Sequence, residues 1–223
     1  MNTDLRTEAI VLKRTNYGET DRIVNFLTPS GRVNALAKGV RREKSRLASG
    51  IEPFSLSEIV VHKGKGELDI LTSAKSKEFY RGILADFARL EAASEVIKQV
   101  AKKSEQIDSS EYFKISVQAM RAIDKGGNLA IILTWFYFNL VKIGGEQINL
   151  FTDDDGDKLE LDEQYAWNNT TLTLRKSVAG KISTDEIKMM RLMLSAELNL
   201  VLRVEVTFDV DELLYIAKSL NQM

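Results

Sequence analysis

The densest positive charge in the sequence lies in a nine-residue stretch, residues 38–46, which contains a single acid, Glu43. Its five cations are Lys38, Arg41, Arg42, Lys44 and Arg46. Gly39 interrupts the strand-like pattern before the stretch, and no apolar period runs through it. A cationic loop can neutralise phosphates and release their counterions, which is typical of nucleic-acid binding. A solvated loop that only keeps the protein soluble would have the same composition, so both interpretations stay open.

The other residue types that carry chemistry form no recognisable site. The chain has no cysteine, which excludes disulfides, thiolate zinc sites, iron–sulfur clusters and cysteine nucleophiles. The single histidine, His62, has no second histidine for a transition metal and no nucleophile at a recognisable spacing. We therefore expect no catalytic residue, no metal and no cofactor, in a protein that is not an enzyme.

An acidic segment, residues 153–163, carries seven Asp and Glu. Three of its acids alternate as in a calcium loop, namely Asp153, Asp155 and Asp157. Such a loop needs Gly at its sixth position and Glu at its twelfth, but Lys158 and Gln164 stand there. The pattern is therefore interpreted as an Asp-Gly turn between two strands.

Positive charge is concentrated in the first third of the chain. Residues 1–80 hold 14 Lys and Arg against 10 Asp and Glu, a net charge of +4, and the remainder holds 17 against 22, a net charge of −5. An anion-binding face is therefore expected in the first third. The turn at residues 63–66 lacks the spacing of a phosphate loop, but its lysines, Lys63 and Lys65, can add to that face.

Aromatic residues in this basic part are candidates for stacking on nucleobases. Tyr17 lies in a predicted turn beside Arg14 and is the best of these candidates. Phe26 and Phe54 lie in apolar runs, so we interpret both as core residues.

The first residues of the chain contain no apolar secretory region. No uninterrupted apolar run approaches the ~18 residues that suggest a membrane span. With the lack of cysteine, these features lead us to expect a cytoplasmic protein.

The elements that must position these residues change from strands to helices along the chain. We predict five short strands, separated by turn signals, at residues 9–12, 22–28, 32–38, 54–62 and 68–72. Five strands in about 80 residues are typical of a small antiparallel barrel or sandwich, and the OB-fold is the best-known barrel of that length. The fold class is therefore predicted to be α+β, with an OB-fold nucleic-acid-binding domain at residues 1–78.

The rest of the chain, residues 79–223, is predicted to be an α-helical domain with a small β-hairpin insert at about residues 149–175. Apolar spacing and cap signatures predict its helices. These run from residue 83 to about 103, from 108–111 to about 125, over 129–143, after Ser183, and over 211–220. In the helix after Ser183, we expect Ile187, Met190, Leu194 and Leu198 to share one face.

Residues 8–71 resemble the opening of the bacterial RecO recombination-mediator proteins. The resemblance rests on the order and spacing of several pieces. These are residues 9–14 (Ala-Ile-Val-Leu-Lys-Arg), 17–22 (Tyr-Gly-Glu-Thr-Asp-Arg), 26–28 with Gly31-Arg32, 37–42 (Ala-Lys-Gly-Val-Arg-Arg) with 44–47, Pro53-Phe54, and 64–68. The resemblance implies an N-terminal OB-fold followed by a helical domain, in agreement with the element pattern.

The resemblance also implies a non-enzymatic DNA repair and recombination protein in the bacterial cytoplasm, associated with the nucleoid. Such a protein binds single- and double-stranded DNA, anneals complementary strands and helps load the recombinase onto strands coated by the single-stranded-DNA-binding protein. Its expected partners are DNA, the RecR protein and the acidic C-terminal tail of the coating protein, with the recombinase filament as an indirect partner and no membrane.

Two departures from the family pattern concern the second half of the chain. Many relatives carry a four-cysteine zinc site where this chain has Gly144 to Leu150 followed by residues 152–157, so we predict no zinc and a lobe held by packing alone. Relatives usually have an Arg before the aromatic stretch of the central helix, but residues 134–138 (Thr-Trp-Phe-Tyr-Phe) are uncharged here. The site for the coating protein's tail must then use other cations or be weak.

The predicted DNA contacts are the five cations of residues 38–46, with further cations flanking them and Tyr17 stacking on a base. The flanking cations are Arg14, Arg22, Lys63 and Lys65. Three alternatives stay open. They are a mobile solvated loop, a protein–protein adaptor that acts through its helical domain, and an RNA-binding accessory factor, because an OB-fold does not by itself choose between DNA and RNA.

Overall fold

The computed structural model describes residues 4–64, 66, 68–105 and 110–221. The chain divides into two compact units, Met1–Lys125 and Gly126–Met223. The first unit contains all five strands of a barrel and three helices, and the second contains a helical bundle and a hairpin. The predicted domain boundary after residue 78 falls at the end of the last barrel strand and stays a prediction.

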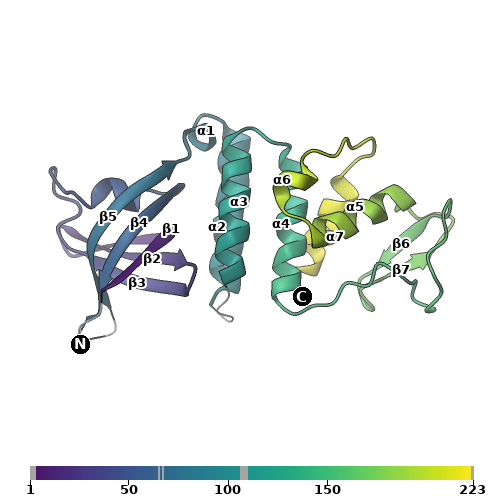
Figure 1. Cartoon of the computed structure of the whole chain (residues 1–223), viewed down its shortest axis with the longest axis horizontal. Coiled ribbons are helices and arrows are strands. Elements are labelled where there is room, and N and C mark those ends of the chain that lie inside the picture. Colours follow the sequence, from purple (N-terminus) through teal and green to yellow (C-terminus); the bar gives the residue numbers. More distant parts are fainter. Residues whose placement is uncertain (1–3, 65, 67, 106–109, 222–223) are drawn as a thin grey trace. The chain divides into compact units, whose positions relative to one another are not determined.

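The first unit is built on a closed five-stranded barrel (Figure 1). Its strands are β1 (Leu5–Tyr17), β2 (Asp21–Thr28), β3 (Gly31–Ala37), β4 (Ser55–His62) and β5 (Asp69–Phe79). Around the barrel the order is β1-β2-β3-β5-β4, and β1 pairs with β4 to close it. The pairs are antiparallel except β3 with β5, which is parallel. This arrangement confirms the predicted OB-fold followed by helices, and a barrel rather than a sandwich.

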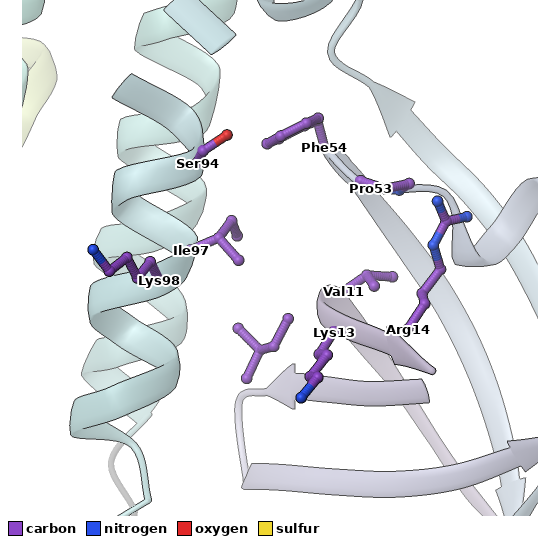
Figure 2. Close-up of a pocket in the computed structure, with 9 residues that line it drawn as sticks. Val11, Lys13, Arg14, Pro53, Phe54, Ser94, Ile97 and Lys98 are labelled. Carbon is purple, nitrogen blue, oxygen red and sulfur yellow. The ribbon is translucent and has the colours of Figure 1, made fainter. Parts of the chain in front are cut away.

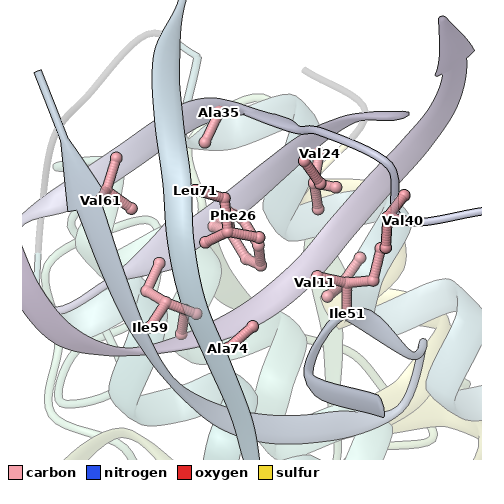
Figure 3. Close-up of a cluster of buried hydrophobic side chains, with 12 residues drawn as sticks. Val11, Val24, Phe26, Ala35, Val40, Ile51, Ile59, Val61, Leu71 and Ala74 are labelled. Atoms are coloured by element: carbon pink, nitrogen blue, oxygen red, sulfur yellow. The ribbon is translucent and has the colours of Figure 1, made fainter. Parts of the chain in front are cut away.

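Alternation of small or branched apolar residues with polar ones decides which face of each strand lines the barrel. In β2 the inward residues are Val24 and Phe26, and in β3 they are Ala35 and Ala37, all fully buried. Figure 3 shows these strands contributing side chains to one cluster around Phe26. The interpretation of Phe26 as a core residue is therefore confirmed.

Two strands extend beyond their predicted ends. Tyr17 was expected in a turn but is the last residue of β1, where it pairs with Asp21. β5 continues past residue 72 to Phe79, which pairs with Ser55. The end of β5 (Lys-Ser-Lys-Glu-Phe) has no apolar alternation, so only its pairing with β4 keeps it extended.

Three helices complete the first unit, α1 (Arg81–Leu84), α2 (Phe87–Lys103) and α3 (Ser110–Asp124), together with the short helix η1 (Ala48–Ile51). The predicted run from residue 83 to 103 is interrupted before α2, because the Asp86 carboxylate accepts a hydrogen bond from the Arg89 amide at 2.9 Å and caps a new helix. Of the cap signature predicted before α3, Asp108 and Ser109 lie outside the described residues.

Two arginines tie these helices to the barrel. Arg32 in β3 donates to the Ala101 carbonyl of α2 at 3.3 Å and pairs with Glu105 at 2.8 Å. Arg121 of α3 makes a two-pronged contact with the Glu78 carboxylate of β5, at 2.8 and 2.5 Å. A planar guanidinium matched to a carboxylate in this way also fixes orientation.

The second unit is centred on α4 (Leu129–Ile143), which is buried over most of its surface, as its apolar sequence predicts. Trp135 is almost fully buried, and its indole N–H donates to the Ala196 carbonyl at 2.9 Å. The other helices of the unit are α5 (Thr184–Ser195), α6 (Leu198–Val201) and α7 (Asp211–Leu220). A capping box of Ser183 and Glu186 begins α5. The prediction that Leu198 continues the face of α5 is wrong, because α5 ends at Ser195 and Leu198 begins α6.

The hairpin of the second unit consists of β6 (Tyr165–Asn168) and β7 (Thr173–Lys176). The prediction that packing alone holds this lobe is wrong, since ion pairs contribute. Arg175 pairs with Asp154 at 2.7 Å, and Lys176 pairs with Glu160 at 2.6 Å. The buried Tyr165 hydroxyl accepts a hydrogen bond from the Glu160 amide at 2.8 Å.

The predicted Asp-Gly turn lies at the start of the same lobe. The Asp153 carboxylate accepts hydrogen bonds from the amides of Asp155 and Asp157, at 3.1 and 2.9 Å, and Gly156 has φ +88°. This carboxylate is therefore used to close the turn. Throughout the described residues, no helix is long and apolar enough to cross a membrane.

Candidate nucleic-acid interface

The basic loop, defined here as residues 38–46, leaves the barrel at the end of β3. Gly39 has φ +63°, a left-handed conformation that costs other residues energy, so glycine suits the sharp exit from the strand. The next side chain, Val40, is 3% exposed and joins the barrel core beside Ile51. The loop is thus fixed to the barrel at its third residue, directly before Arg41 and Arg42, which argues against a freely mobile loop.

Hydrogen bonds also fix the basic loop to the turn between β1 and β2. The Gly39 amide donates to the Asp21 carboxylate at 2.7 Å, and the Arg41 amide donates to the Thr20 carbonyl at 2.9 Å. The Arg41 guanidinium reaches the Gly18 carbonyl at 3.3 Å. Tyr17, whose side chain is 53% exposed, stands at the end of β1 directly before this turn. The structure therefore brings the stacking candidate and the basic loop to the same end of the barrel.

The five cations of the basic loop are all exposed. Among the described residues, none of them forms an ion pair with a carboxylate, whereas other cations of the barrel do. The paired cations are Arg6, Arg14, Arg32 and Lys77. Cations that lack carboxylate partners create a positive potential that attracts phosphates. Unpaired charge on an anchored loop is the observation that favours an anion-binding surface here.

Asp21 is a positioning residue to which the sequence reasoning gave no role. The Gly39 amide, the Thr20 hydroxyl and the nearby cations of Arg42 and Lys38 lower the pKa of the Asp21 carboxyl. Its contact with Gly39 joins residues 18 apart in the sequence, and the register of β2 with β3 creates it. The one signal in the sequence that could have indicated this role is the position of Asp21, at the start of a strand and directly after a turn that contains Gly18.

The anchoring of the basic loop by Asp21 is expected to depend on pH. Because the folded-state pKa lies below the ordinary value of 3.8, the stabilisation is fully present above that value and is lost as the pH falls through the lowered pKa. The amide chemical shift of Gly39 should therefore titrate in acid. In Asp21→Asn, whose amide oxygen still accepts the hydrogen bond, this titration should disappear. An unchanged titration in Asp21→Asn would show that another group controls the loop.

The flanking cations differ in how free they are. Arg14 is engaged by Glu52 at 3.0 Å and by the Ile51 carbonyl at 3.3 Å. The Arg22 guanidinium donates to Asn16 at 3.1 Å, and Lys63 is exposed in the turn between β4 and β5. Lys65 lies outside the described residues. All four remain predicted DNA contacts, although Arg14 already has two partners within the protein.

The turn that carries Lys63 is placed by the barrel topology. β5 begins at Asp69 beside Ala35 of β3, three residues before Lys38. The turn between β4 and β5 therefore leaves the barrel next to the strand that leads into the basic loop.

A strip of polar side chains lies on the outer surface of β1, β2 and β3. Because Val24 and Ala35 point inward, their neighbours Asn25 and Asn34 point outward, where their amides are hydrogen-bonded at 2.5 Å. Lys13 of β1 pairs with Asn25 and is also exposed. This strip of polar side chains can supply hydrogen bonds to a ligand without demanding a particular base sequence.

Comparison with protein families finds one match to the first unit. Residues 1–80 match the family described as Recombination protein O N terminal. The match contains the whole barrel, including the basic loop and the turn between β1 and β2.

Comparison with individual proteins finds relatives named DNA repair protein RecO. The relative from Rubrobacter xylanophilus is 34% identical over 122 residues, which is 54% of this chain and 49% of the relative. That from Alkaliphilus metalliredigens is 38% identical over 103 residues, 46% of this chain and 42% of the relative. That from Roseiflexus sp. is 30% identical over 149 residues, 66% of this chain and 52% of the relative. The chain thus spans about half the length of the curated relatives it matches.

Proposed function

The chain belongs, through its N-terminal barrel, to the bacterial RecO family, and from this premise we propose that it is a mediator of DNA repair and recombination. In this proposal the protein binds single- and double-stranded DNA, anneals complementary strands and helps load the recombinase onto coated single strands. It performs no covalent chemistry. The observation that supports the proposal best is the anchored basic loop, whose cations lack carboxylate partners among the described residues.

Phosphate contacts are the proposed basis of binding. Each phosphate that a lysine or arginine neutralises releases counterions, which drives binding without regard to sequence. Arg41 and Arg42 offer planar guanidinium groups that can take two phosphate oxygens at once, and Lys44 offers a compact charge. Tyr17 adds an exposed ring on which a base can stack.

Annealing follows from the same surface. Two complementary strands repel each other through their phosphates, and a shared cationic surface lowers that repulsion. Base pairing then supplies the sequence specificity that the protein lacks. The protein has to hold the backbones and leave the base edges free, and an exposed loop on a rigid barrel suits this task.

The proposed partners beyond DNA are the RecR protein and the acidic tail of the single-stranded-DNA-binding protein, with the recombinase filament affected indirectly. The family resemblance supports them, and the negative charge of the tail suits a protein with unpaired cations. In the second unit, α4 contains no arginine before its aromatic stretch. Binding of the tail there is therefore proposed to be weak or to use other cations.

A strand-annealing assay on coated single strands tests the proposed function. The full chain is expected to accelerate annealing of complementary oligonucleotides coated with single-stranded-DNA-binding protein. A variant with Arg41, Arg42 and Lys44 replaced by Ala is expected to anneal at the protein-free rate. No acceleration by the unmodified chain, on naked or coated strands, would contradict the proposal.

A further inference from the structure

A groove in the first unit lies where β1 and the segment before β4 face α2 (Figure 2). Its volume is about 320 Å³, at the lower end of the range of pockets that take small-molecule-sized groups. Figure 2 shows Ser94 and Ile97 of α2 on one side, with Phe54 and Val11 facing them from the barrel. The groove is therefore lined on both sides by side chains that suit a flat apolar group.

The charge around the groove is one-sided. Of its nine lining residues three are cations, Lys13, Arg14 and Lys98, and none is acidic. Arg14 is engaged by Glu52, and the Lys98 ammonium lies 3.9 Å from Glu95. Lys13 is exposed and has no ion pair among the described residues. Lys13 therefore places a positive charge beside an apolar surface, which suits a ligand that combines an apolar face with negative charge.

Phe54 supplies an aromatic wall in an unusual conformation. It has φ +54°, a left-handed value that is costly for a bulky residue, and its carbonyl accepts a hydrogen bond from the Tyr80 amide at 3.1 Å. The interpretation of Phe54 as a core residue is wrong, because its ring is partly exposed at the groove. Strained residues cluster where proteins bind ligands, so the strain and the groove point to the same use.

The outer edge of β1 connects the groove to the basic loop. Lys13, Thr15 and Tyr17 alternate along the strand and are all exposed, so they share its outer face. At a rise of ~3.3 Å per residue, Lys13 and Tyr17 lie about 13 Å apart along the strand. This matches about four nucleotides at the ~3.4 Å spacing of a stacked strand.

We propose that this groove receives one unstacked base of a single-stranded nucleic acid whose backbone is held by the basic loop. Phe54 provides the stacking surface, and Lys13 contacts a neighbouring phosphate. The inference rests on the proposed function, because the basic loop must first bind the strand.

The fluorescent adenine analogue 2-aminopurine, placed at successive positions of a short single-stranded oligonucleotide, tests the proposal with the full chain. At saturation, one position should change its fluorescence more than its neighbours. The Phe54→Gly variant removes the ring, and Gly adopts a positive φ without cost. It should lose this signal and about fivefold or more of the affinity. Phe54→Tyr keeps the ring and should retain both.

Substitution on the opposite wall avoids any effect on the barrel. Ser94 is exposed on α2, so Ser94→Glu adds a carboxylate to the groove and should also weaken binding, while Ser94→Lys, of similar size, should not. If Phe54→Gly and Ser94→Glu both left the fluorescence and the affinity unchanged, while binding still depended on the basic loop, the base-binding groove would be overturned. The proposed function would then remain intact. If the unmodified chain did not bind the oligonucleotide, both the base-binding groove and the proposed function would be overturned.

Discussion

Replacing Arg41, Arg42 and Lys44 together by Ala is expected to weaken binding of single-stranded DNA by about a hundredfold at ~0.1 M salt. Each phosphate contact with a single strand contributes ~0.7 to the slope of log K against the logarithm of the salt concentration. Three contacts therefore contribute about 2 to log K at ~0.1 M salt, relative to ~1 M salt, where their contribution vanishes. All three side chains are exposed, and their loss leaves the burial of Val40 and the hydrogen bond from the Gly39 amide to Asp21 in place. Fluorescence anisotropy of a labelled oligonucleotide gives the affinity.

A control variant separates the position of these charges from their number. Lys75, Lys102 and Lys125 are exposed cations of the same unit that lie outside the basic loop and the flanking turns. Replacing these three by Ala changes the net charge equally but should lower the affinity far less. Equal losses in the two triple variants would mean that overall charge, and not the basic loop, attracts the DNA.

Phe26→Ala is expected to lower the free energy of unfolding by about 3–5 kcal/mol, because it leaves a cavity at the centre of the barrel. Phe26 is fully buried and belongs to the cluster that also includes Val40 of the basic loop. Folded proteins have a free energy of unfolding of only ~5–15 kcal/mol, so the barrel of the variant should unfold at a much lower midpoint urea concentration. Far-UV circular dichroism during urea titration measures the change.

The same substitution at an exposed phenylalanine is the matched control. Phe87, at the start of α2, is 74% exposed, so Phe87→Ala should change the free energy of unfolding by no more than ~0.5 kcal/mol. Similar effects of Phe26→Ala and Phe87→Ala would contradict the placement of Phe26 in the barrel core. DNA binding should weaken with Phe26→Ala only under conditions where the barrel unfolds.

The barrel was predictable because its strands repeat a local pattern. Apolar alternation in β2 and β3 and turn signals between the strands are properties of short windows, and they led to five strands and an OB-fold. The ends of β1 and β5 were missed, because the residues there are polar and are held extended by pairing with β2 and β4, which the pattern within a single strand does not show. The break before α2 was missed because the capping by Asp86 outweighs the apolar period that continues through it.

The candidate interface was predictable in composition but not in construction. The charge of the basic loop can be counted in the sequence, and its likeness to the RecO family could be seen in the order of the motifs. The construction of the interface depends on residues that are far apart in the sequence and that the folded barrel brings together. Examples are the contact of Asp21 with Gly39, the packing of Val40 in the barrel core and the pairing of Arg14 with Glu52. The conformation of Phe54 likewise has no sequence signature, since bulky residues seldom have positive φ.

The salt dependence of binding tests the central claim most directly, because it counts phosphate contacts without assuming their geometry. The logarithm of the binding constant for single-stranded DNA is plotted against the logarithm of the salt concentration for the full chain, the basic-loop triple variant and the control triple variant. We predict that the slope becomes shallower by about 2 in the basic-loop variant and stays close to that of the full chain in the control. Parallel lines for the full chain and the basic-loop variant would contradict the claim that Arg41, Arg42 and Lys44 hold the DNA backbone.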